Sequence, residues 1–160
     1  MKRPSVLFVC LGNICRSPLA EFAFRAAAAR EGLDVDVESA GTGTYHLGYA
    51  PDPRAQAVAR KVGLDMSAKR ARRVTPDDFR RFTHVVALDE DNLVDLEQMR
   101  PSDATAELSM LLDHVPGRHG EPVADPYYGD ADGFDTTWND VTAGAEAIVE
   151  LLRKSRGTGR

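Results

Sequence analysis

The segment that decides the fold is residues 6–18, which read VLFVCLGNICRSP. Residues 6–9 form a short, wholly apolar run with two β-branched members, a pattern typical of a strand buried on both faces. Ser17 and Pro18 favour the start of a helix, because serine can cap a helix and proline suits its first position. Residues 10–16 are therefore predicted to form the turn between a buried strand and a helix.

The remaining sequence continues this alternation of strands and helices. Glycine and proline mark a loop over residues 41–53, and Asp89 is placed to cap a helix. Further strands are predicted over residues 35–38, 84–88 and 108–112, and helices over 17–31, 54–61, a short stretch from 75, 90–99 and 135–154. The pattern predicts an α/β fold, a single-domain four-stranded parallel sheet with helices on both faces, over residues 1–154, followed by a flexible tail at 155–160.

Composition excludes several classes of protein. The 160 residues carry a formal net charge of −5, which argues against general binding to nucleic acid or a membrane surface. The two cysteines are too few for a disulfide scaffold, a four-cysteine zinc site or an iron–sulfur cluster. No signal peptide or membrane-spanning stretch is found, so we expect a cytoplasmic protein. The excess of arginine over lysine is typical of a GC-rich bacterial genome.

The first turn contains the residues of an anion-binding site. Cys10 and Arg16 flank a loop before a helix N-terminus, where backbone N–H groups and the helix dipole attract an anion. Arg16 can bind a phosphate with two N–H groups, and this positive field favours the thiolate form of Cys10 at neutral pH. Gly12 and Asn13 tolerate a positive φ. The alternative, that Cys10 is only a small core residue at the end of a strand, leaves these agreements unexplained.

These residues resemble the phosphate loop of the low-molecular-weight protein tyrosine phosphatases. The match covers residues 10–18, Cys-x-Gly-Asn-x-Cys-Arg-Ser-Pro, and is joined by residues 125–130, DPYYGD, which look like the acid loop of that family. Residues 39–42 and 51–54 are similar to family segments between the two loops, and the resemblance extends from about residue 5 to 152. It implies a strand order of 2-1-3-4, with residues 1–154 as the phosphatase domain.

The resemblance also implies a two-step phosphoryl transfer without a metal or other cofactor. Cys10 would attack phosphorus to give a phosphocysteine intermediate, and Asp125 would act as general acid and then as general base. The alternative for Asp125 is a simple Asp-Pro turn, with Asp130 as a less favoured substitute acid. The oxygens of the phosphoryl group would be held by the loop residues Leu11, Gly12, Asn13, Ile14, Cys15 and Arg16.

A deep cleft would hold the substrate, a phosphotyrosyl protein or a small aryl phosphate. Tyr127 and Tyr128 would form one wall, and relatives have such tyrosines phosphorylated by a tyrosine kinase. Leu11, Tyr45 and His46 would complete the rim, although a single loop histidine is more often a surface residue than a catalytic one. We expect a monomer or a weak dimer.

A second group of residues would support the loop. Ser17 can hydrogen-bond the Cys10 thiolate, and Cys15 is close enough in sequence to form a reversible disulfide with Cys10 that guards it from overoxidation, or else is a structural thiol. Some relatives have a histidine, bonded to the loop asparagine, where this chain has Ala68. Asn13 must then be held by another side chain, for which Ser39 is the candidate.

Three other functions compete with this one. A protein-arginine phosphatase is similar but tends to have threonine in place of Ile14 and lacks the Tyr127–Tyr128 pair. An arsenate reductase needs further cysteines, and none follows Cys15. A dithiol redox sensor would use both cysteines without turnover, but has no use for Arg16 and Asp125.

Overall fold

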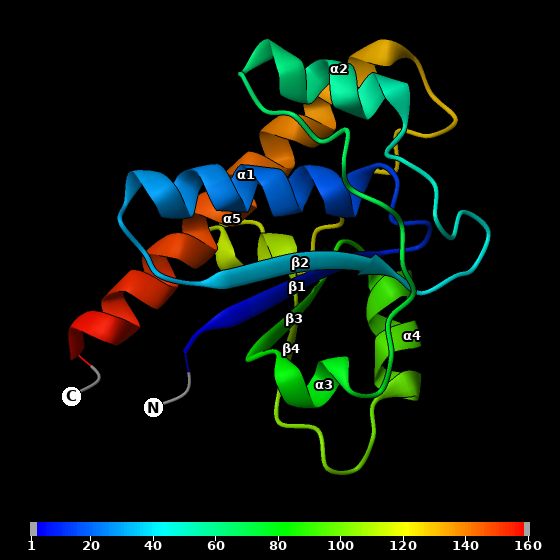
Figure 1. The fold of residues 1–160 in the computed structure, drawn as a ribbon. Helices are drawn as coiled ribbons and strands as arrows, with labels where there is room; N and C mark the ends of the chain where they lie inside the picture. Colours follow the sequence, from blue (N-terminus) through cyan, green and yellow to red (C-terminus); the bar gives the residue numbers. More distant parts are fainter. Residues whose placement is uncertain (1–2, 159–160) are drawn as a thin grey trace.

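Four parallel strands form the centre of the computed structural model, which describes residues 3–158 (Figure 1). Their order in the sheet is β2-β1-β3-β4, which confirms the predicted order. The strands are β1 (Ser5–Cys10), β2 (Asp36–Gly41), β3 (His84–Ala87) and β4 (Glu107–Met110). Because β1 lies between β2 and β3, its carboxyl end is where the chain connections diverge to the two sides of the sheet, the place where α/β folds bind ligands.

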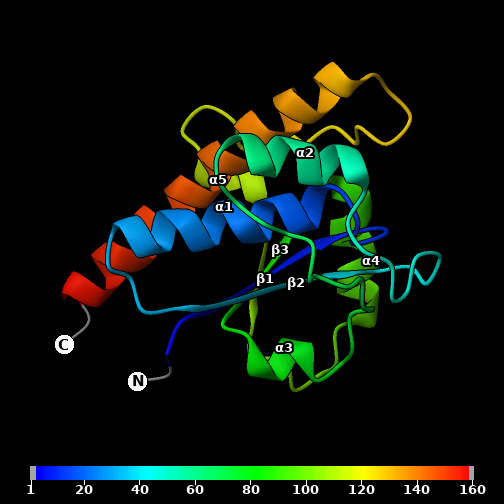
Figure 2. The ribbon, with the colours of Figure 1, turned by 45° about the horizontal axis from the view of Figure 1, so that its top comes forward.

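Helices cover both faces of this sheet, as expected. In two views, α1 (Arg16–Arg30), α2 (Pro53–Lys61) and α5 (Ala131–Thr158) lie on one side, and α3 (Asp78–Arg81) and α4 (Glu90–Met99) on the other (Figures 1 and 2). Asp89 caps α4, because its carboxylate accepts the Asn92 backbone N–H at 2.8 Å. Among the described residues, no helix is both long and apolar enough to cross a membrane.

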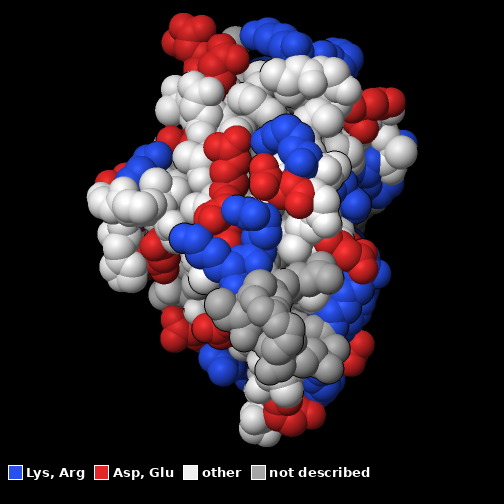
Figure 3. Space-filling model, turned by 90° about the vertical axis from the view of Figure 1, so that its left-hand side faces the viewer, with Lys and Arg blue, Asp and Glu red and all other residues white. Residues whose placement is uncertain are grey.

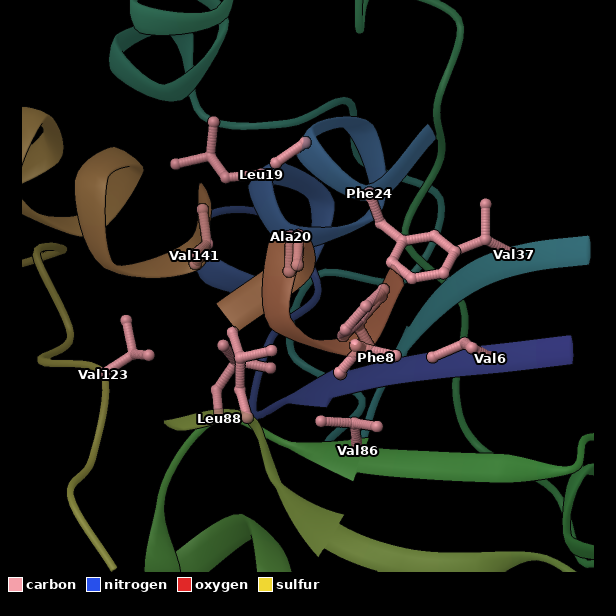
Figure 4. Packing of buried hydrophobic residues seen from close by; sticks show 14 of the residues in the cluster. Val6, Phe8, Leu19, Ala20, Phe24, Val37, Val86, Leu88, Val123 and Val141 are labelled. Carbon is pink, nitrogen blue, oxygen red and sulfur yellow. The ribbon is translucent and has the colours of Figure 1, made fainter. Parts of the chain in front are cut away.

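The side chains of β1 pack into both cores by simple alternation. Val6 and Phe8 point toward α1 and α5, where the Phe8 ring meets Phe24 edge-on at 5.6 Å (Figure 4). Leu7 and Val9 point to the opposite face, in the same cluster as Phe79 of α3 and Leu96 of α4. With both faces covered, β1 is held rigidly, and so is the loop that follows it.

The ends of several elements differ from the prediction. Helix α1 begins at Arg16 with Cys15 as its N-cap residue, so Ser17 is not the cap. Strand β4 ends at Met110, and residues 111–114 form the 3₁₀ helix η1 (Leu111–His114), because the Asp113 carboxylate accepts the Met110 N–H at 3.1 Å and turns the chain. Helix α5 is longer than predicted, from Ala131 to Thr158, so it continues into the predicted tail; residues 159–160 lie outside the described part of the chain.

Oppositely charged side chains are interspersed on the face at the amino ends of the strands (Figure 3). Arg30 of α1 pairs with Glu146 of α5 at 3.3 Å, and Arg153 of α5 pairs with Glu31, the residue after α1, at 3.6 Å. Such exposed pairs contribute little to stability individually. This mixture of charges makes the face a poor match for a polyanion.

Gly144 is the point where α5 packs most closely on η1. A Cβ at this position would lie 2.4 Å from Leu111 Cγ, a fully buried side chain that has no room to move away. We expect Gly144→Ala to lower the free energy of unfolding by about 1–3 kcal/mol from overpacking, although alanine favours helix. Chemical denaturation would measure it. Gly133→Ala in the same helix is the control, because its Cβ would make only an ordinary contact with Pro126 at 3.6 Å. A Gly144→Ala protein as stable as the wild type would contradict the close packing.

Candidate active site

A cavity of about 470 Å³ opens at the carboxyl end of β1. The phosphate loop contributes Cys10, Leu11, Gly12, Ile14, Cys15 and Arg16 to its lining. Two other loops contribute Tyr45, His46, Asp125, Tyr127 and Tyr128. The fold therefore brings Asp125 to Cys10 across 115 positions of sequence. Asn13, Ser17 and Ser39 are buried behind the loop, where the prediction gave them supporting roles.

The sulfur of Cys10 lies at the end of β1 with two polar neighbours. The Asn13 backbone N–H donates to Sγ at 3.3 Å, and Ser17 Oγ lies 2.9 Å from Sγ. Ser17 Oγ accepts a hydrogen bond from the Asn13 amide, and its own hydrogen can go to the sulfur at 2.9 Å or to the Ala40 carbonyl oxygen at 3.5 Å. An N–H group and a hydroxyl beside one sulfur are surroundings suited to a nucleophilic cysteine.

Asn13 fixes the shape of the loop. It adopts φ +57°, a left-handed conformation that asparagine tolerates better than most residues. Its side-chain amide donates to Ser17 at 2.9 Å and to Ser39 at 3.0 Å, and its carbonyl oxygen accepts the Arg72 backbone N–H at 3.1 Å. The structure thus places Ser39 at the Asn13 amide, where the sequence analysis expects it to hold the loop.

A buried ion pair lies behind Ser39. The Ser39 hydroxyl donates to the buried carboxylate of Glu21 at 2.6 Å. Lys69 approaches the same carboxylate at 3.4 Å and donates to the Ser39 carbonyl at 2.8 Å, while Ala68 is exposed. Burial lowers the pKa of Lys69, and Glu21 opposes that shift. Lys69, the residue after Ala68, therefore supports the loop. The sequence analysis did not predict this role.

At two glycines near the phosphate loop, the absence of a side chain lets neighbouring atoms come close. Of the two loop residues that tolerate a positive φ, Asn13 adopts one and Gly12 does not; a Cβ at Gly12 would lie 2.9 Å from His46 Nδ1. At Gly41, the end of β2, a Cβ would lie 2.6 Å from the Leu11 carbonyl oxygen. A side chain at Gly41 would push the phosphate loop out of place.

The guanidinium of Arg16 is buried and fixed on two sides. It donates to Asp89 Oδ2 at 2.7 Å and to the Val123 carbonyl at 2.9 Å, and Asp125 Oδ2 lies 3.7 Å from its other terminal nitrogen. Burial alone would lower the pKa of Arg16, but the neighbouring Cys10 and Asp89 outweigh it and raise the pKa. The sequence indicated Asp89 only as a helix cap; it also orients Arg16 at the cavity.

Asp125 begins a loop that is held from outside by Arg54. Asp125 Oδ1 accepts the Tyr127 N–H at 3.1 Å, and its side chain is 43% exposed, so it is open to the cavity. Arg54 donates to the Tyr127 carbonyl at 3.0 Å and to both Asp52 oxygens, and its guanidinium stacks on the Phe134 ring at 4.6 Å. Arg54 thereby ties this loop to the N-terminus of α2, a link with no signal in the sequence.

Aromatic rings form the walls above the phosphate loop. His46 lies between Tyr49 and Tyr127, with ring centroids 5.4 Å and 6.0 Å apart, and Tyr127 meets Tyr128 edge-on at 4.9 Å. His46 is not a surface residue: it is half-buried, lines the cavity, and its Nδ1 is buried without a hydrogen-bond partner among the described residues. The walls are well suited to an aromatic ring.

The two cysteines of the loop differ in chemistry. Both are free and buried. Burial, and then the Asp52 carboxylate and Cys10, raise the pKa of the Cys15 thiol well above its ordinary value. Cys15 is therefore a thiol at neutral pH, and of the two cysteines Cys10, with an N–H group and a hydroxyl beside its sulfur, is the one suited to act as a nucleophile.

In this parallel α/β sheet, the turn after the central strand carries a cysteine and an arginine. These features define a class of proteins that bind an oxyanion in front of a thiol. Residues 5–157 match the family model for low molecular weight phosphotyrosine protein phosphatases, and the chain belongs to this family.

Relatives of the chain cover almost its whole length. It is 39% identical to the Schizosaccharomyces pombe low molecular weight phosphotyrosine protein phosphatase over 136 residues, 83% of this chain and 86% of the relative. The crystal structure of Bacillus subtilis YfkJ, a low molecular weight protein-tyrosine-phosphatase, superposes with a TM-score of 0.89 at 35% identity and covers 98% of both chains. The crystal structure of a Drosophila arginine phosphatase is also similar, with a TM-score of 0.87 at 29% identity over 92% of this chain and 97% of that chain.

Proposed function

We propose that this protein hydrolyses phosphotyrosine in proteins, and small aryl phosphates, through a phosphocysteine intermediate. The observation that supports it most is the single cavity shared by Cys10, Arg16 and Asp125, with an N–H group and a hydroxyl beside the Cys10 sulfur. The aromatic walls favour a phenyl phosphate over an aliphatic one.

In the first step, the Cys10 thiolate attacks phosphorus opposite the bond to the tyrosine oxygen. The S–P bond forms as the P–O bond breaks, and Asp125 gives its proton to the departing oxygen. Within the described residues, the backbone N–H groups of Gly12, Ile14 and Cys15 have no acceptor, so they are available to the phosphoryl oxygens together with Arg16.

In the second step, water displaces the sulfur. Asp125, now a carboxylate, takes a proton from the water as its oxygen attacks phosphorus, the P–S bond breaks, and phosphate leaves with the Cys10 thiolate restored. The Ser17 hydroxyl stabilises the thiolate as a leaving group. No step here passes through a metal ion, because Arg16 and the loop N–H groups stabilise the negative charge on the phosphoryl oxygens.

Further parts of the proposal concern regulation and location. A kinase would reach Tyr128, which is 93% exposed, more readily than Tyr127, which is half-buried against Arg54. If a peroxide oxidised Cys10 to a sulfenic acid, the Cys15 sulfur would displace water from it to form a Cys10–Cys15 disulfide, which external thiols would reduce. That the protein is bacterial and cytoplasmic, and that it is a monomer or a weak dimer, stay predictions.

The second candidate is a phosphatase of phosphoarginine, since two similar structures are named arginine phosphatases. We expect kcat/KM for a phosphotyrosyl peptide to exceed that for the matched phosphoarginyl peptide by about 100-fold or more, because Tyr127 and Tyr128 pack against a ring, whereas an unpaired guanidino group loses its hydrogen bonds there. Both assays would be run with a chelator. A preference for phosphoarginine would overturn the proposal, and so would loss of phosphotyrosine turnover on chelation.

A further inference from the structure

Exposed apolar side chains gather around the mouth of the cavity. Among the described residues, eight large hydrophobic side chains are exposed, and only three of them lie away from this region. Of the other five, Leu11, Tyr45 and Tyr128 line the cavity, Tyr49 packs against His46 of the lining, and Leu47 follows His46 in the same loop. A cluster of exposed apolar groups beside a polar site marks a place where another molecule binds.

Two of these side chains lie beyond the catalytic cavity itself. Leu47 and Tyr49, which we call the apolar shelf, do not line the cavity, and they are 50% and 59% exposed. The shelf is nevertheless continuous with it, since the Tyr49 ring packs edge-on against His46, which does line the cavity. The shelf belongs to the loop between β2 and α2, which projects past the carboxyl ends of the strands (Figure 1).

The backbone of this loop is fixed before anything binds. The Gly48 N–H donates to the Ala71 carbonyl and the Ala71 N–H to the Tyr49 carbonyl, both at 2.9 Å. Gly48 adopts φ +81°, which lets the chain turn between Leu47 and Tyr49. Two apolar side chains are thus held out to solvent by a rigid backbone, so a ligand does not have to order them.

We propose that the apolar shelf binds an apolar side chain next to the phosphotyrosine of the substrate, and so selects phosphotyrosyl segments with an apolar neighbour. This inference rests on the proposed function. With the phosphate against the phosphate loop and the ring between the walls, the substrate backbone must pass over the rim of the cavity. The side chain beside the phosphotyrosine then meets Leu47 and Tyr49, and burying it there removes apolar surface of both partners from water.

The test compares three substrates on wild type and variants. The substrates are p-nitrophenyl phosphate, a phosphotyrosyl peptide with leucine on both sides of the phosphotyrosine, and the same peptide with serine at those places. The variants are Leu47→Ser, Tyr49→Ser and their combination. Leu151→Ser is the matched control, because Leu151 is 45% exposed on α5, outside the cavity and the shelf.

We expect the wild type to prefer the leucine peptide by about tenfold in kcat/KM, the range that one apolar contact supplies. Leu47→Ser and the double variant should both lose this preference. The turnover of p-nitrophenyl phosphate and of the serine peptide by Leu47→Ser, and all activities of Leu151→Ser, should stay within about twofold. A wild type without preference overturns the inference, as does an equal loss on all three substrates, which would make the shelf a support for the cavity.

Two further outcomes separate this inference from its alternatives. If analytical ultracentrifugation shows a dimer that only the shelf variants break, and peptide preference is unchanged, the occupant is a second copy of the chain and the inference is wrong. If the wild type turns over p-nitrophenyl phosphate but neither phosphotyrosyl peptide, the proposed function fails instead, regardless of the shelf.

Discussion

Replacing Cys10 with serine is expected to reduce kcat for any aryl phosphate by about 10⁴-fold or more, the loss seen when a catalytic nucleophile is removed. A serine hydroxyl is a much weaker nucleophile than a cysteine sulfur, and the loop contains no base to activate it. The fold should persist, because Cys10 is buried beside Ser17 and Asn13, and a hydroxyl can take part in the same hydrogen bonds. Steady-state assays and thermal unfolding would measure activity and stability on the same samples.

Cys15→Ser is the matched control for this prediction. The same atom is exchanged in the same loop, but the raised pKa of the Cys15 thiol excludes it as a thiolate at neutral pH, and its backbone N–H remains. We expect it to retain activity within about tenfold, and rapid acid quench of the wild type to find the phosphoryl group on Cys10. A Cys10→Ser protein with wild-type turnover, or a phosphoryl group on Cys15, would refute the mechanism.

The sequence was sufficient for the alternation of strands and helices because its signals are local, whereas the strand order came from the resemblance to the family. Residues 6–9 are apolar without interruption, which only a strand covered on both faces permits, and the glycine- and proline-rich loop over 41–53 is equally plain. The end of β4 was not predictable in this way. Residues 108–112 continue to read as a strand, and the turn into η1 depends on one carboxylate, Asp113, and on the room that Gly144 leaves for Leu111.

The candidate site can be divided in the same way, into residues whose roles are local in the sequence and residues whose roles depend on the fold. Residues 10–16 carry their chemistry in their own order, so Cys10 and Arg16 could be assigned from sequence. The partners that hold them could not, because Asp89, Lys69 and Arg54 are ordinary charged residues until the fold places each beside a buried group. Neither the residues next to Lys69 in the sequence nor its distance along the chain from Ser39 predicts that Lys69 supports Ser39. Lys69 has that role because the fold places it beside the buried carboxylate of Glu21.

Asp125 should show its role as a general acid through the leaving group. Tyrosine has a pKa of about 10 in solution, so a tyrosine oxygen leaves slowly unless it is protonated, whereas p-nitrophenolate leaves readily. We expect Asp125→Asn to lower kcat by about 10²–10⁴-fold on phosphotyrosine and by much less on p-nitrophenyl phosphate. The asparagine is the sharper variant than alanine, because its carbonyl oxygen can still accept the Tyr127 N–H and keep the loop in place.

Asp130→Asn distinguishes this role from a general effect of charge in the acidic loop. Asp130 is exposed and is not part of the cavity lining in the described residues, so its variant should stay within about twofold of wild type on both substrates. An equal loss with both leaving groups in Asp125→Asn would reduce Asp125 to a partner of Arg16, from which it lies 3.7 Å. If instead the loss of kcat in Asp130→Asn depends on the leaving group, Asp130 is the proton donor. If the loss of kcat depends on the leaving group in Asp125→Asn and not in Asp130→Asn, the general acid is Asp125, which the fold brings to Cys10 across 115 positions of sequence.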